Sequence, residues 1–319
     1  MRLVITGSAG RLARVLIPHL LQNQDVEFIL GIDHQSADYA DPRYAHRRMD
    51  IREMGANDIP AGTDALIHMA FVLMGGGLGK RRHDRNEVRA VNVAGSENVF
   101  AACASAGVGQ IVFLSSAAVY GAWPDNPPLL DETAPLRPMR GFAYAEDKVT
   151  VERMLDAFEH KHPDIIISRL RPHAIVGPHA HPLLNRILRQ PFYPLSSALT
   201  QCVFEEDVAT AIVLALRKRA AGAFNLAAQP AMSLYEMLGY TQKWRIPLPL
   251  APAAVLHRLL WRLTPDVGEP GWVQGIRHPL AVDTQRAHSE LGWQPRFDLP
   301  ACLSAVRASG ASDASRQHV

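Results

Sequence analysis

The fold is decided close to the start of the chain, where residues 3–16 read LVITGSAGRLARVL. The apolar and β-branched residues 3–6 predict a buried strand, and the apolar spacing after the glycines predicts a helix. Between them, Gly7 and Gly10 permit a sharp turn and let a pyrophosphate approach the free N–H groups at the helix start. Ala13 is the small residue where the helix would pack on the strand. This unit predicts a nucleotide-binding α/β fold.

Further segments alternate between strand and helix in the same way. The segments expected to be strands are residues 26–32, 48–49, 65–70, 111–114, 165–167 and 224–226. The segments expected to be helices are residues 85–106, 144–160 and 208–216. Strands that alternate with helices indicate a doubly wound parallel sheet, so the predicted fold class is α/β with a Rossmann sheet and a smaller C-terminal substrate lobe.

Asp33 ends the second predicted strand, at the place where the adenosine ribose of a dinucleotide would lie. A carboxylate there can accept hydrogen bonds from both ribose hydroxyls and would repel a 2′-phosphate. The sequence therefore predicts NAD rather than NADP as the cofactor. The alternative for Asp33 is an ordinary turn residue at a strand end.

Tyr144 and Lys148 are four residues apart on a predicted helix and therefore project from one face. A free tyrosine, whose pKa is about 10, is a poor base near neutral pH, and a neighbouring ammonium lowers the pKa of the phenol. The pair predicts general acid/base chemistry at Tyr144. Ser116, after the strand 111–114, could hydrogen-bond a substrate oxygen beside this tyrosine. The alternatives are a solvated helix face for the pair and a turn serine for Ser116.

Together these motifs resemble the extended short-chain dehydrogenase/reductase family, also called the NAD-dependent epimerase/dehydratase family. The matching residues are Thr6-Gly7-x-x-Gly10-x-x-Ala13, Asp33, Asp50-Ile51, His68-x-Ala70, Asn92-Val93-x-Gly95-Ser96-x-Asn98, Ser115-Ser116-x-x-Val119-Tyr120-Gly121, Tyr144-x-x-x-Lys148, Arg171-Pro172-x-x-x-Val176-Gly177-Pro178 and Asp283-x-x-x-Ala287-x-x-x-Leu291-Gly292-Trp293-x-Pro295. Their order and spacing are specific to the family and much less specific to a substrate.

The resemblance implies roles for individual residues. The catalytic residues would be Ser116, which orients the reacting oxygen, Tyr144, the general acid/base, and Lys148, which lowers the pKa of the tyrosine and holds the nicotinamide ribose. The cofactor would be held by Gly7, Ala9, Gly10, Arg11, Leu12, Asp33, Asp50, Ile51, Met69, Ala70, Tyr144 and Lys148. The substrate would meet Phe71, Ser116, Ala117, Pro172 and His173. No metal is expected, because His179 and His181 have no third ligand at a suitable spacing.

These roles predict an NAD-dependent oxidoreductase that removes hydride from a secondary alcohol carbon while Tyr144 takes the hydroxyl proton. The first candidate is a sugar or sugar-nucleotide epimerase, and the alternative is a dehydrogenase or reductase of a non-nucleotide alcohol or ketone. A non-catalytic dinucleotide sensor would show a broken Ser/Tyr/Lys set, which is intact here. A sugar 4,6-dehydratase is not expected, because the Asp-Glu pair that such relatives carry after the serine position is replaced by Ala117-Ala118.

Two positions count against a sugar nucleotide. Family members that bind one usually carry an arginine six residues before the position of Asp207, and another in an Arg-Pro-Gly-Asp segment ahead of the final helix. Position 201 is Gln, and residues 275–280 read GIRHPL. A neutral amide grips a diphosphate much less strongly than a guanidinium does. Weak binding of UDP and dTDP is therefore predicted, unless Arg277 or Arg186 substitutes.

The chain is expected to divide into two parts and a tail. Residues 1–170, with about 204–228, would form the NAD-binding Rossmann domain, and residues 171–203 and 229–308 the substrate-binding lobe. Residues 309–319 are rich in Ser, Ala and Gly and are expected to be disordered.

Two further segments carry expectations of their own. Leu256, Leu259, Leu260 and Leu263 share one helix face, which indicates core rather than membrane contact. The glycine-rich segment 75–79 is either a substrate lid or a plain connection.

Composition and charge limit the partners. The 319 residues carry a net charge of +2 with one short basic run, so neither nucleic acid nor a membrane is expected as a partner. No apolar run approaches the roughly 18 residues of a membrane span, and the chain start lacks signal-peptide features. Three widely spaced cysteines favour a reducing cytoplasm. The resemblance implies a small-molecule substrate and a homodimer, formed through the helices 85–106 and 144–160.

Overall fold

A central sheet of seven parallel strands organises the computed structural model, which describes residues 1–75, 83–188, 192–242, 244–263 and 267–316. In sheet order the strands are β3 (Tyr44–Arg48), β2 (Phe28–Asp33), β1 (Arg2–Thr6), β4 (Ala65–His68), β5 (Gln110–Leu114), β6 (Ile166–Pro172) and β11 (Gly222–Leu226). The direction of strand succession reverses between β1 and β4. Doubly wound sheets bind ligands at such a switch point, beyond the carboxyl ends of the strands. The predicted α/β Rossmann class is confirmed.

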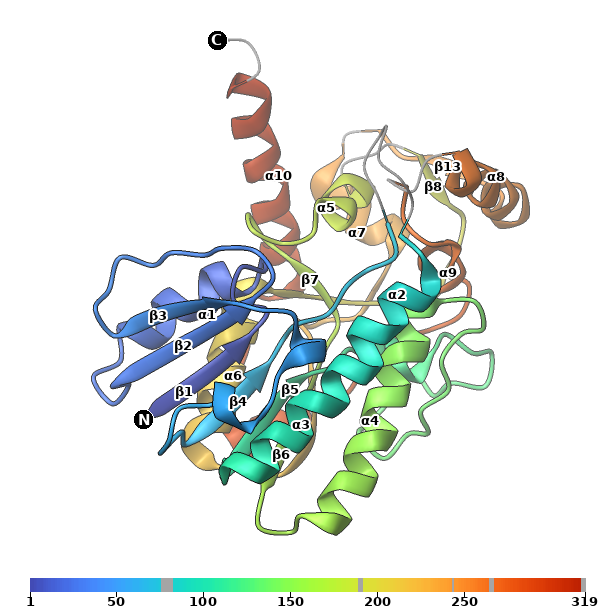
Figure 1. The fold of residues 1–319 in the computed structure, drawn as a ribbon. Coiled ribbons are helices and arrows are strands. Elements are labelled where there is room, and N and C mark those ends of the chain that lie inside the picture. Colours follow the sequence, from blue (N-terminus) through green and yellow to red (C-terminus); the bar gives the residue numbers. More distant parts are fainter. Residues whose placement is uncertain (76–82, 189–191, 243, 264–266, 317–319) are drawn as a thin grey trace.

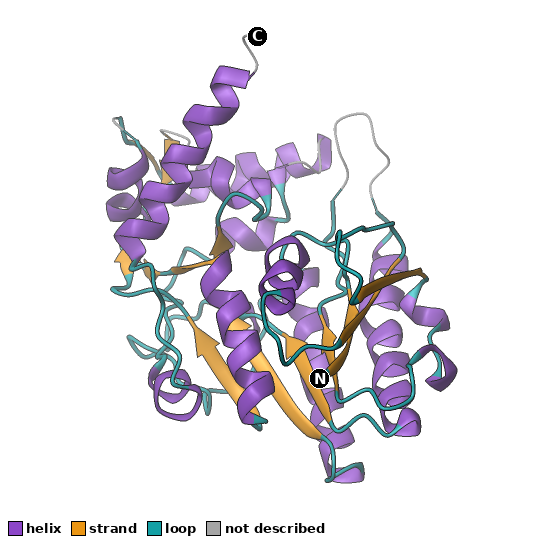
Figure 2. Cartoon of the chain, turned by 90° about the vertical axis from the view of Figure 1, so that its left-hand side faces the viewer, coloured by secondary structure: helices purple, strands orange, loops and turns teal. Residues whose placement is uncertain are grey.

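Helices cover both faces of the sheet (Figures 1 and 2). On one face, α1 (Ala13–Leu21) and α6 (Glu205–Lys218) pack their buried leucines, isoleucines and valines against the strands. On the other face, α3 (Gly95–Ala106) and α4 (Ala143–Lys161) lie side by side. Because both faces are covered, β1, β4 and β5 are almost wholly buried and read as continuous apolar runs.

The predicted helix 85–106 has three parts. It begins with α2 (Arg85–Arg89), widens into the π-helical turn η3 (Ala90–Ala94) and continues as α3. Single π-helical turns of this kind are frequent at functional sites. Asn92 lies in this turn and is buried.

The chain leaves the central sheet after β6 and returns to it with α6 and β11. Three small sheets lie outside it: β7 (Ala174–Val176) with β10 (Cys202–Phe204), β9 (Leu199–Thr200) with β12 (Met232–Ser233), and β8 (Phe192–Pro194) with β13 (Ile246–Leu248). The helices outside it are α5 (Pro182–Leu188), α7 (Leu234–Thr241), α8 (Leu250–Leu263), α9 (Pro270–Gln274), η6 (Ala287–Leu291) and α10 (Leu299–Arg316). The short turns η1 (Ile51–Glu53), η2 (Ala56–Asp58) and η4 (Ala117–Tyr120) follow strands of the main sheet.

The helix α8 contradicts the expectation of a core contact. Its leucines face outward: Leu256 is 53% exposed, Leu259 50% and Leu263 82%. The opposite face, with Ala253, Ala254, His257 and Trp261, is less exposed and carries the packing. Helical periodicity shows that the leucines share one face of the helix, but it does not show whether that face meets the protein core or solvent.

The C-terminal tail also differs from expectation, because α10 extends to Arg316 and residues 309–316 are helical rather than disordered. The first half of α10 is anchored by the buried Leu299, Leu303 and Val306. Alanines beyond this anchor favour continuation of the helix. Residues 317–319 lie outside the described residues.

Most of the glycine-rich segment 75–79 and the basic run 80–82 also fall outside the described residues. None of the helices in the described part of the chain is both long enough and apolar enough to cross a membrane.

Candidate active site

The glycine turn lies at the switch point of the sheet. Gly7 has a φ of +78°, and a Cβ at this position would lie 2.6 Å from the backbone nitrogen of Ala70. The turn therefore tolerates only glycine, both for its left-handed backbone and for its approach to the end of β4. The N–H of Met69 donates to the carbonyl of Thr6 (3.1 Å), which ties the two strand ends together.

The start of α1 suits a pyrophosphate. Gly10 closes the turn by donating to the carbonyl of Gly7 (3.0 Å), and the exposed Arg11 with Leu12 leads into the helix. No side chain caps α1, and within its first turn the N–H groups of Arg14 and Val15 donate to the carbonyls of Arg11 and Leu12 (3.2 and 3.0 Å). The positive end of the helix dipole at this start favours an anion. Ala13 is buried against the sheet, as the small residue of the motif should be. The turn fits a dinucleotide.

Asp33 lies against this turn. Its Oδ2 accepts a hydrogen bond from the N–H of Ala9 (3.1 Å), and its Oδ1 accepts one from Gln35 (2.9 Å). The carboxylate thus stands at the carboxyl end of β2 beside the turn, where a dinucleotide ribose would come. Its remaining acceptor capacity fits a ribose hydroxyl.

Asp50 and Ile51 have distinct environments. The Asp50 carboxylate begins η1 and binds Arg52, accepting from its backbone N–H (2.9 Å) and from Nε (3.0 Å). Hydrogen bonding to the Arg52 side chain holds the pKa of Asp50 below its usual value. Ile51 is buried against Gly95 of α3, where an added Cβ would lie 2.7 Å from the Ile51 Cδ1. Gly95 therefore lets α3 approach Ile51 closely.

Tyr144 lies in an aromatic cluster. Its ring meets Phe71 edge-on (5.6 Å between centroids), is tilted against Phe142 (5.8 Å) and stacks on Trp272 of α9 (5.9 Å, 26° between planes). Burial raises the pKa of the Tyr144 phenol above 10, and hydrogen bonding with Ser116 partly opposes this shift. The phenol is therefore protonated near neutral pH.

Lys148 is buried one helical turn further along α4. Its Nζ donates to the carbonyl of Leu114 at the end of β5 (2.5 Å) and lies 3.7 Å from the centroid of the Phe71 ring. Burial lowers the pKa of Lys148 to about 7, although Glu152 and Asp147 favour its charged form. The ammonium is 6.0 Å from the centroid of the Tyr144 ring.

The predicted lowering of the Tyr144 pKa by Lys148 is therefore not found in this structure. The ammonium points to a strand carbonyl and an aromatic face, and its own charge is weakened by burial. Desolvation of the phenol is the larger effect here. Tyr144 and Lys148 share one helix face, as predicted.

Ser116 and Ala117 follow β5, at the same edge of the sheet. Ser116 begins η4, and its Oγ accepts from the N–H of Ala118 (3.2 Å). Ala117 is buried and supplies no proton-transferring group. Below them, Ser115 donates to the buried Glu152 (2.5 Å), which also binds Arg171 (2.9 Å). This buried network supports the strand end that carries Ser116.

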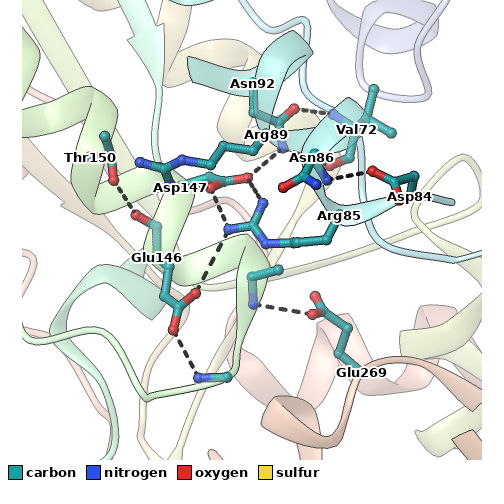
Figure 3. Close-up of polar contacts among 12 residues, drawn as sticks. Val72, Asp84, Arg85, Asn86, Arg89, Asn92, Glu146, Asp147, Thr150 and Glu269 are labelled. Atoms are coloured by element: carbon teal, nitrogen blue, oxygen red, sulfur yellow. Dashed lines mark hydrogen bonds and ion pairs between the residues drawn. The ribbon is translucent and has the colours of Figure 1, made fainter. Parts of the chain in front are cut away.

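Asp147, between Tyr144 and Lys148 in the sequence, is the centre of a buried ionic cluster (Figure 3). Its carboxylate accepts from Arg85 (2.7 and 2.8 Å), Arg89 (3.0 Å) and the amide of Asn92 (3.1 Å). Asn92 also donates to the carbonyl of Val72 (2.9 Å) and accepts from its N–H (2.7 Å). The cluster joins α4, the helix 85–106 and the chain that carries Phe71.

Glu269 holds the same helix from the C-terminal side. It precedes α9, is 5% exposed, and its Oε1 accepts from the N–H of Ala143 at the start of α4 (3.1 Å, Figure 3). Burial raises the pKa of Glu269 to about 7. Behind it, Gly271 packs on Phe142 so closely that a Cβ would lie 2.2 Å from the ring.

The sequence analysis missed Asp147, Glu269 and Trp272. For Asp147 a signal existed, since it lies inside the motif and is adjacent to Lys148. The pair Glu269-Pro270 indicates a helix start, but nothing local connects it with Ala143, which lies 126 residues away.

Pro172 ends β6 and His173 follows it. The structure does not support the prediction that His173 contacts the substrate. Pro172 is buried in the sheet opposite Leu226. The Nε2 of His173 lies 2.9 Å from the carbonyl oxygen of Leu280, and its Nδ1 accepts from the N–H of Ala174 (2.8 Å). Burial lowers the pKa of His173 to about 4. Both ring nitrogens of this neutral imidazole are therefore used within the fold.

The two positions that bear on phosphate binding lie in different surroundings. Gln201 is buried, its Oε1 accepts from the N–H of Val282 (2.8 Å), and its Nε2 has no hydrogen-bond partner. Arg277 is exposed and lines an open pocket of about 640 Å³. The other residues that line this pocket are Tyr193, Leu195, Ser196, Ser197, Ser233, Tyr235 and Leu250.

Among the described residues, no three His, Cys, Asp or Glu side chains cluster as metal ligands would.

The sequence matches the model of the NAD dependent epimerase/dehydratase family over residues 3–227. The chain belongs to this family and is an NAD-dependent enzyme.

Relatives of this chain include both unassigned and named proteins. An uncharacterized protein of Mycobacterium tuberculosis is 27% identical over 315 residues, covering 92% of this chain and 80% of that protein. A UDP-glucose 4-epimerase of Corynebacterium glutamicum is 24% identical and covers 100% of this chain and 98% of its own length. The solved UDP-glucose 4-epimerase of Thermotoga maritima with UDP-glucose has a TM-score of 0.73 at 19% identity, covering 98% of this chain and 100% of that chain. This last likeness shows the shared fold.

Proposed function

We propose that the enzyme transfers hydride at a secondary alcohol carbon, with Tyr144 as the general acid/base, Ser116 as the residue that orients the reacting oxygen, and Lys148 as the residue that holds the cofactor ribose. The observation that carries this proposal is the meeting of these three side chains at the carboxyl edge of the sheet, next to the glycine turn. NAD, when bound, supplies the hydride acceptor. The residues proposed to hold it are the glycine turn with Asp33, and Asp50 with Ile51.

The phenol form of Tyr144, which burial favours, suits one direction of the reaction, and the other direction needs the phenolate. As a phenol it can give its proton to a carbonyl oxygen, and as a phenolate it can take the proton of a hydroxyl. An epimerase needs both steps at one carbon. Lys148, whose pKa of about 7 makes it partly neutral, can then exchange a proton near neutral pH.

The first substrate candidate is a sugar or sugar nucleotide that is epimerised. A UDP-glucose 4-epimerase aligns with the entire chain. The pocket at Arg277 carries serine and tyrosine side chains that suit sugar hydroxyls. Trp272, stacked on Tyr144, is five residues from Arg277, a span of at most about 18 Å of chain. A substrate that reacts at Tyr144 can therefore extend to this pocket.

The second candidate is a non-nucleotide alcohol or ketone, for which two observations speak. Tyr144 is enclosed by Phe71, Phe142 and Trp272, which suits an apolar substrate. Gln201 is a buried neutral amide where sugar-nucleotide relatives usually carry an arginine. Charge-assisted binding of a diphosphate would rest on Arg277, or on Arg186, whose side chain lies outside the described part of the structure.

One experiment separates the two candidates. Purified enzyme is incubated with NAD and with panels of UDP and dTDP sugars and of hydrophobic alcohols. An epimerase converts a sugar nucleotide without net reduction of NAD, whereas a dehydrogenase accumulates reduced cofactor with an alcohol. Calorimetric titration with UDP, repeated on Arg277→Ala, tests the pocket. Turnover that survives Tyr144→Phe within a few-fold would refute the assignment of the acid/base.

We also propose a homodimer formed by α3 and α4, which lie together on one face of the sheet (Figure 1). Ala101 on α3 and Ala157 on α4 are exposed and small, which permits close approach of a second helix pair. Light scattering should give twice the chain mass, and Ala101→Arg with Ala157→Arg should halve it. The control Ala61→Arg, on an exposed loop, should leave the mass unchanged. A monomeric parent would refute the dimer.

A cytoplasmic location is proposed as well. It is supported by the three cysteines, which are buried and unpaired and so suit a reducing compartment. Cell fractionation tests it, and recovery of the enzyme outside the cytoplasmic and inner-membrane fractions would overturn it.

A further inference from the structure

The helix α8 turns its apolar face away from the protein. Val255, Leu256, Leu259, Leu260 and Leu263 are between 38% and 82% exposed, and no residue of α8 is buried. The face toward the protein carries Ala253, Ala254, His257 and Trp261, which are less exposed. The Nε2 of His257 lies 3.0 Å from the carbonyl oxygen of Val267. A helix that folds for its own core has the opposite arrangement.

The apolar surface continues onto the small sheet next to α8. Strand β13 pairs with β8, and Phe192, Leu195 and Ile246 of this region are 43–57% exposed. Trp244, two residues before β13, is 71% exposed. Nine of the twelve large hydrophobic side chains exposed in the described residues belong to α8 and this sheet region. Exposed apolar surface concentrated in this way marks a contact site.

Charge indicates what this surface contacts. Residues 244–263 contain Arg245, Arg258 and Arg262 and no aspartate or glutamate. On the helical wheel the two arginines of α8 flank one edge of the leucine face. Glu236, before this segment, lies on α7 and caps that helix with Ser233. After the segment, Asp266 lies outside the described residues and Glu269 is buried.

We propose that α8 and the adjoining β8–β13 sheet, here called the apolar patch, bind the surface of an anionic membrane. A helix with leucines on one face, arginines at its edge and a nearby exposed tryptophan lies in the plane of a bilayer interface. Its 14 residues span about 21 Å, which suits lying along the surface and is too short to cross it. Anionic headgroups match the arginines. This proposal revises the sequence-based expectation of no membrane partner.

A second copy of the chain is a poorer occupant of the apolar patch. A two-fold contact through α8 would bring the arginines of both copies to the same interface without any carboxylate from residues 244–263 to pair with them. The position of α8 at the outer edge of the lobe, remote from the seven-stranded sheet, leaves it free to meet a flat surface (Figure 1).

The test is sedimentation of the full-length enzyme with vesicles. One set is phosphatidylcholine alone, and the other contains equal parts of phosphatidylcholine and phosphatidylglycerol. The enzyme should bind the anionic vesicles more tightly, and added salt should weaken this binding. Arg258→Ala with Arg262→Ala should reduce binding to anionic vesicles by about fivefold per arginine and change binding to neutral vesicles little.

Substitutions on the apolar face supply the second arm. Leu259→Glu with Leu263→Glu should weaken binding to both vesicle types by about tenfold or more, because two buried leucines are lost. The control Leu129→Glu changes an exposed leucine outside the patch and should leave binding unchanged. Because both patch leucines face solvent, circular dichroism and NAD affinity should match the parent.

Three results would overturn the proposal: no binding to anionic vesicles, equal loss in Leu129→Glu, or an oligomer in light scattering that Leu259→Glu with Leu263→Glu dissociates. The last result would assign the patch to a second copy.

Discussion

Two buried carboxylates hold the start of α4, the helix that carries Tyr144 and Lys148, and they are compensated in different ways (Figure 3). Asp147 faces the helix 85–106, where two arginines and an asparagine surround it. Glu269 comes from the segment before α9 and accepts from the backbone N–H of Ala143. The first carboxylate is paired with full positive charges, whereas the second relies on backbone dipoles.

Asp147 therefore holds α4 through ion pairs, whereas Glu269 holds it through a hydrogen bond from a carboxyl group that titrates near neutral pH. Asp147 is held by ion pairs with Arg85 and Arg89, and its contact with Asn92 ties α4 to the chain that carries Phe71. Burial with weaker compensation brings the pKa of Glu269 to about 7, so its charge changes near neutral pH. Tyr144 lies between these contacts. The Asp147 contacts therefore hold α4 to the helix 85–106, and the Glu269 contact holds it to the segment before α9.

The largest expected effect comes from the residue that both carboxylates position. Tyr144→Phe removes the proton-transferring group and should lower kcat by roughly 10²–10⁴-fold, while NAD affinity stays within a few-fold. Steady-state kinetics and cofactor titration measure the two quantities. Tyr240→Phe, an exposed tyrosine of the lobe that does not line the Arg277 pocket, is the matched control and should retain full activity. Similar losses in both variants would mean that the positioning contacts serve some other base.

Asp147→Asn tests the ion pairs that hold α4 to the helix 85–106. It leaves Arg85 and Arg89 beside a neutral amide and should lower the free energy of unfolding by about 3 kcal/mol, at the lower end for such clusters because both arginines are partly exposed. Urea denaturation gives the value.

The matched control for this change is Asp156→Asn. Asp156 lies on the same helix and pairs with Arg169 (2.8 Å), but its side chain is 54% exposed. Its loss should cost less than about 1 kcal/mol. Equal losses of unfolding free energy in Asp147→Asn and Asp156→Asn would show that the burial of Asp147 does not strengthen its ion pairs.

Glu269→Gln tests the contact between the titrating Glu269 and the start of α4. The folded state raises the pKa of Glu269 from 4.5 to about 7, so it holds a proton that the unfolded state has released. The free energy of unfolding of the parent should therefore fall between about pH 4.5 and pH 7 relative to the glutamine variant, by roughly 3 kcal/mol. Below this window the two proteins should differ by a constant amount. Parallel profiles across the window would contradict a buried, titrating Glu269.

The same contrast explains which parts of the site could be predicted from sequence. Gly7, Asp33, Ser116 and Tyr144 each lie at a strand end or helix start that local pattern defines, and parallel strands bring such ends to one edge. Glu269 reaches its partner across 126 residues, and no local pattern encodes that contact.

The direction of the Tyr144 pKa was mispredicted for a related reason. Spacing on the helix shows that Lys148 is near, but the orientation of its ammonium depends on the carbonyl of Leu114 and on the ring of Phe71. Likewise the leucine stripe of α8 has the same period whether it faces a core or solvent, so sequence located the helix and misplaced its face.

The smallest expected effect is on the free energy of unfolding when an outward-facing leucine of α8 is shortened. A buried leucine of α4, on the sheet, is the comparison. Leu259→Ala on α8 removes a side chain that is 50% exposed and should change the free energy of unfolding by less than about 0.5 kcal/mol. Leu155→Ala on α4 empties a fully buried site and should cost about 2–5 kcal/mol, because a cavity remains. Both changes delete the same atoms from a helix, so the difference isolates burial. If Leu259→Ala costs as much as Leu155→Ala in the isolated protein, α8 packs its leucines against this chain or a second copy of it, and the contrast between the two regions fails.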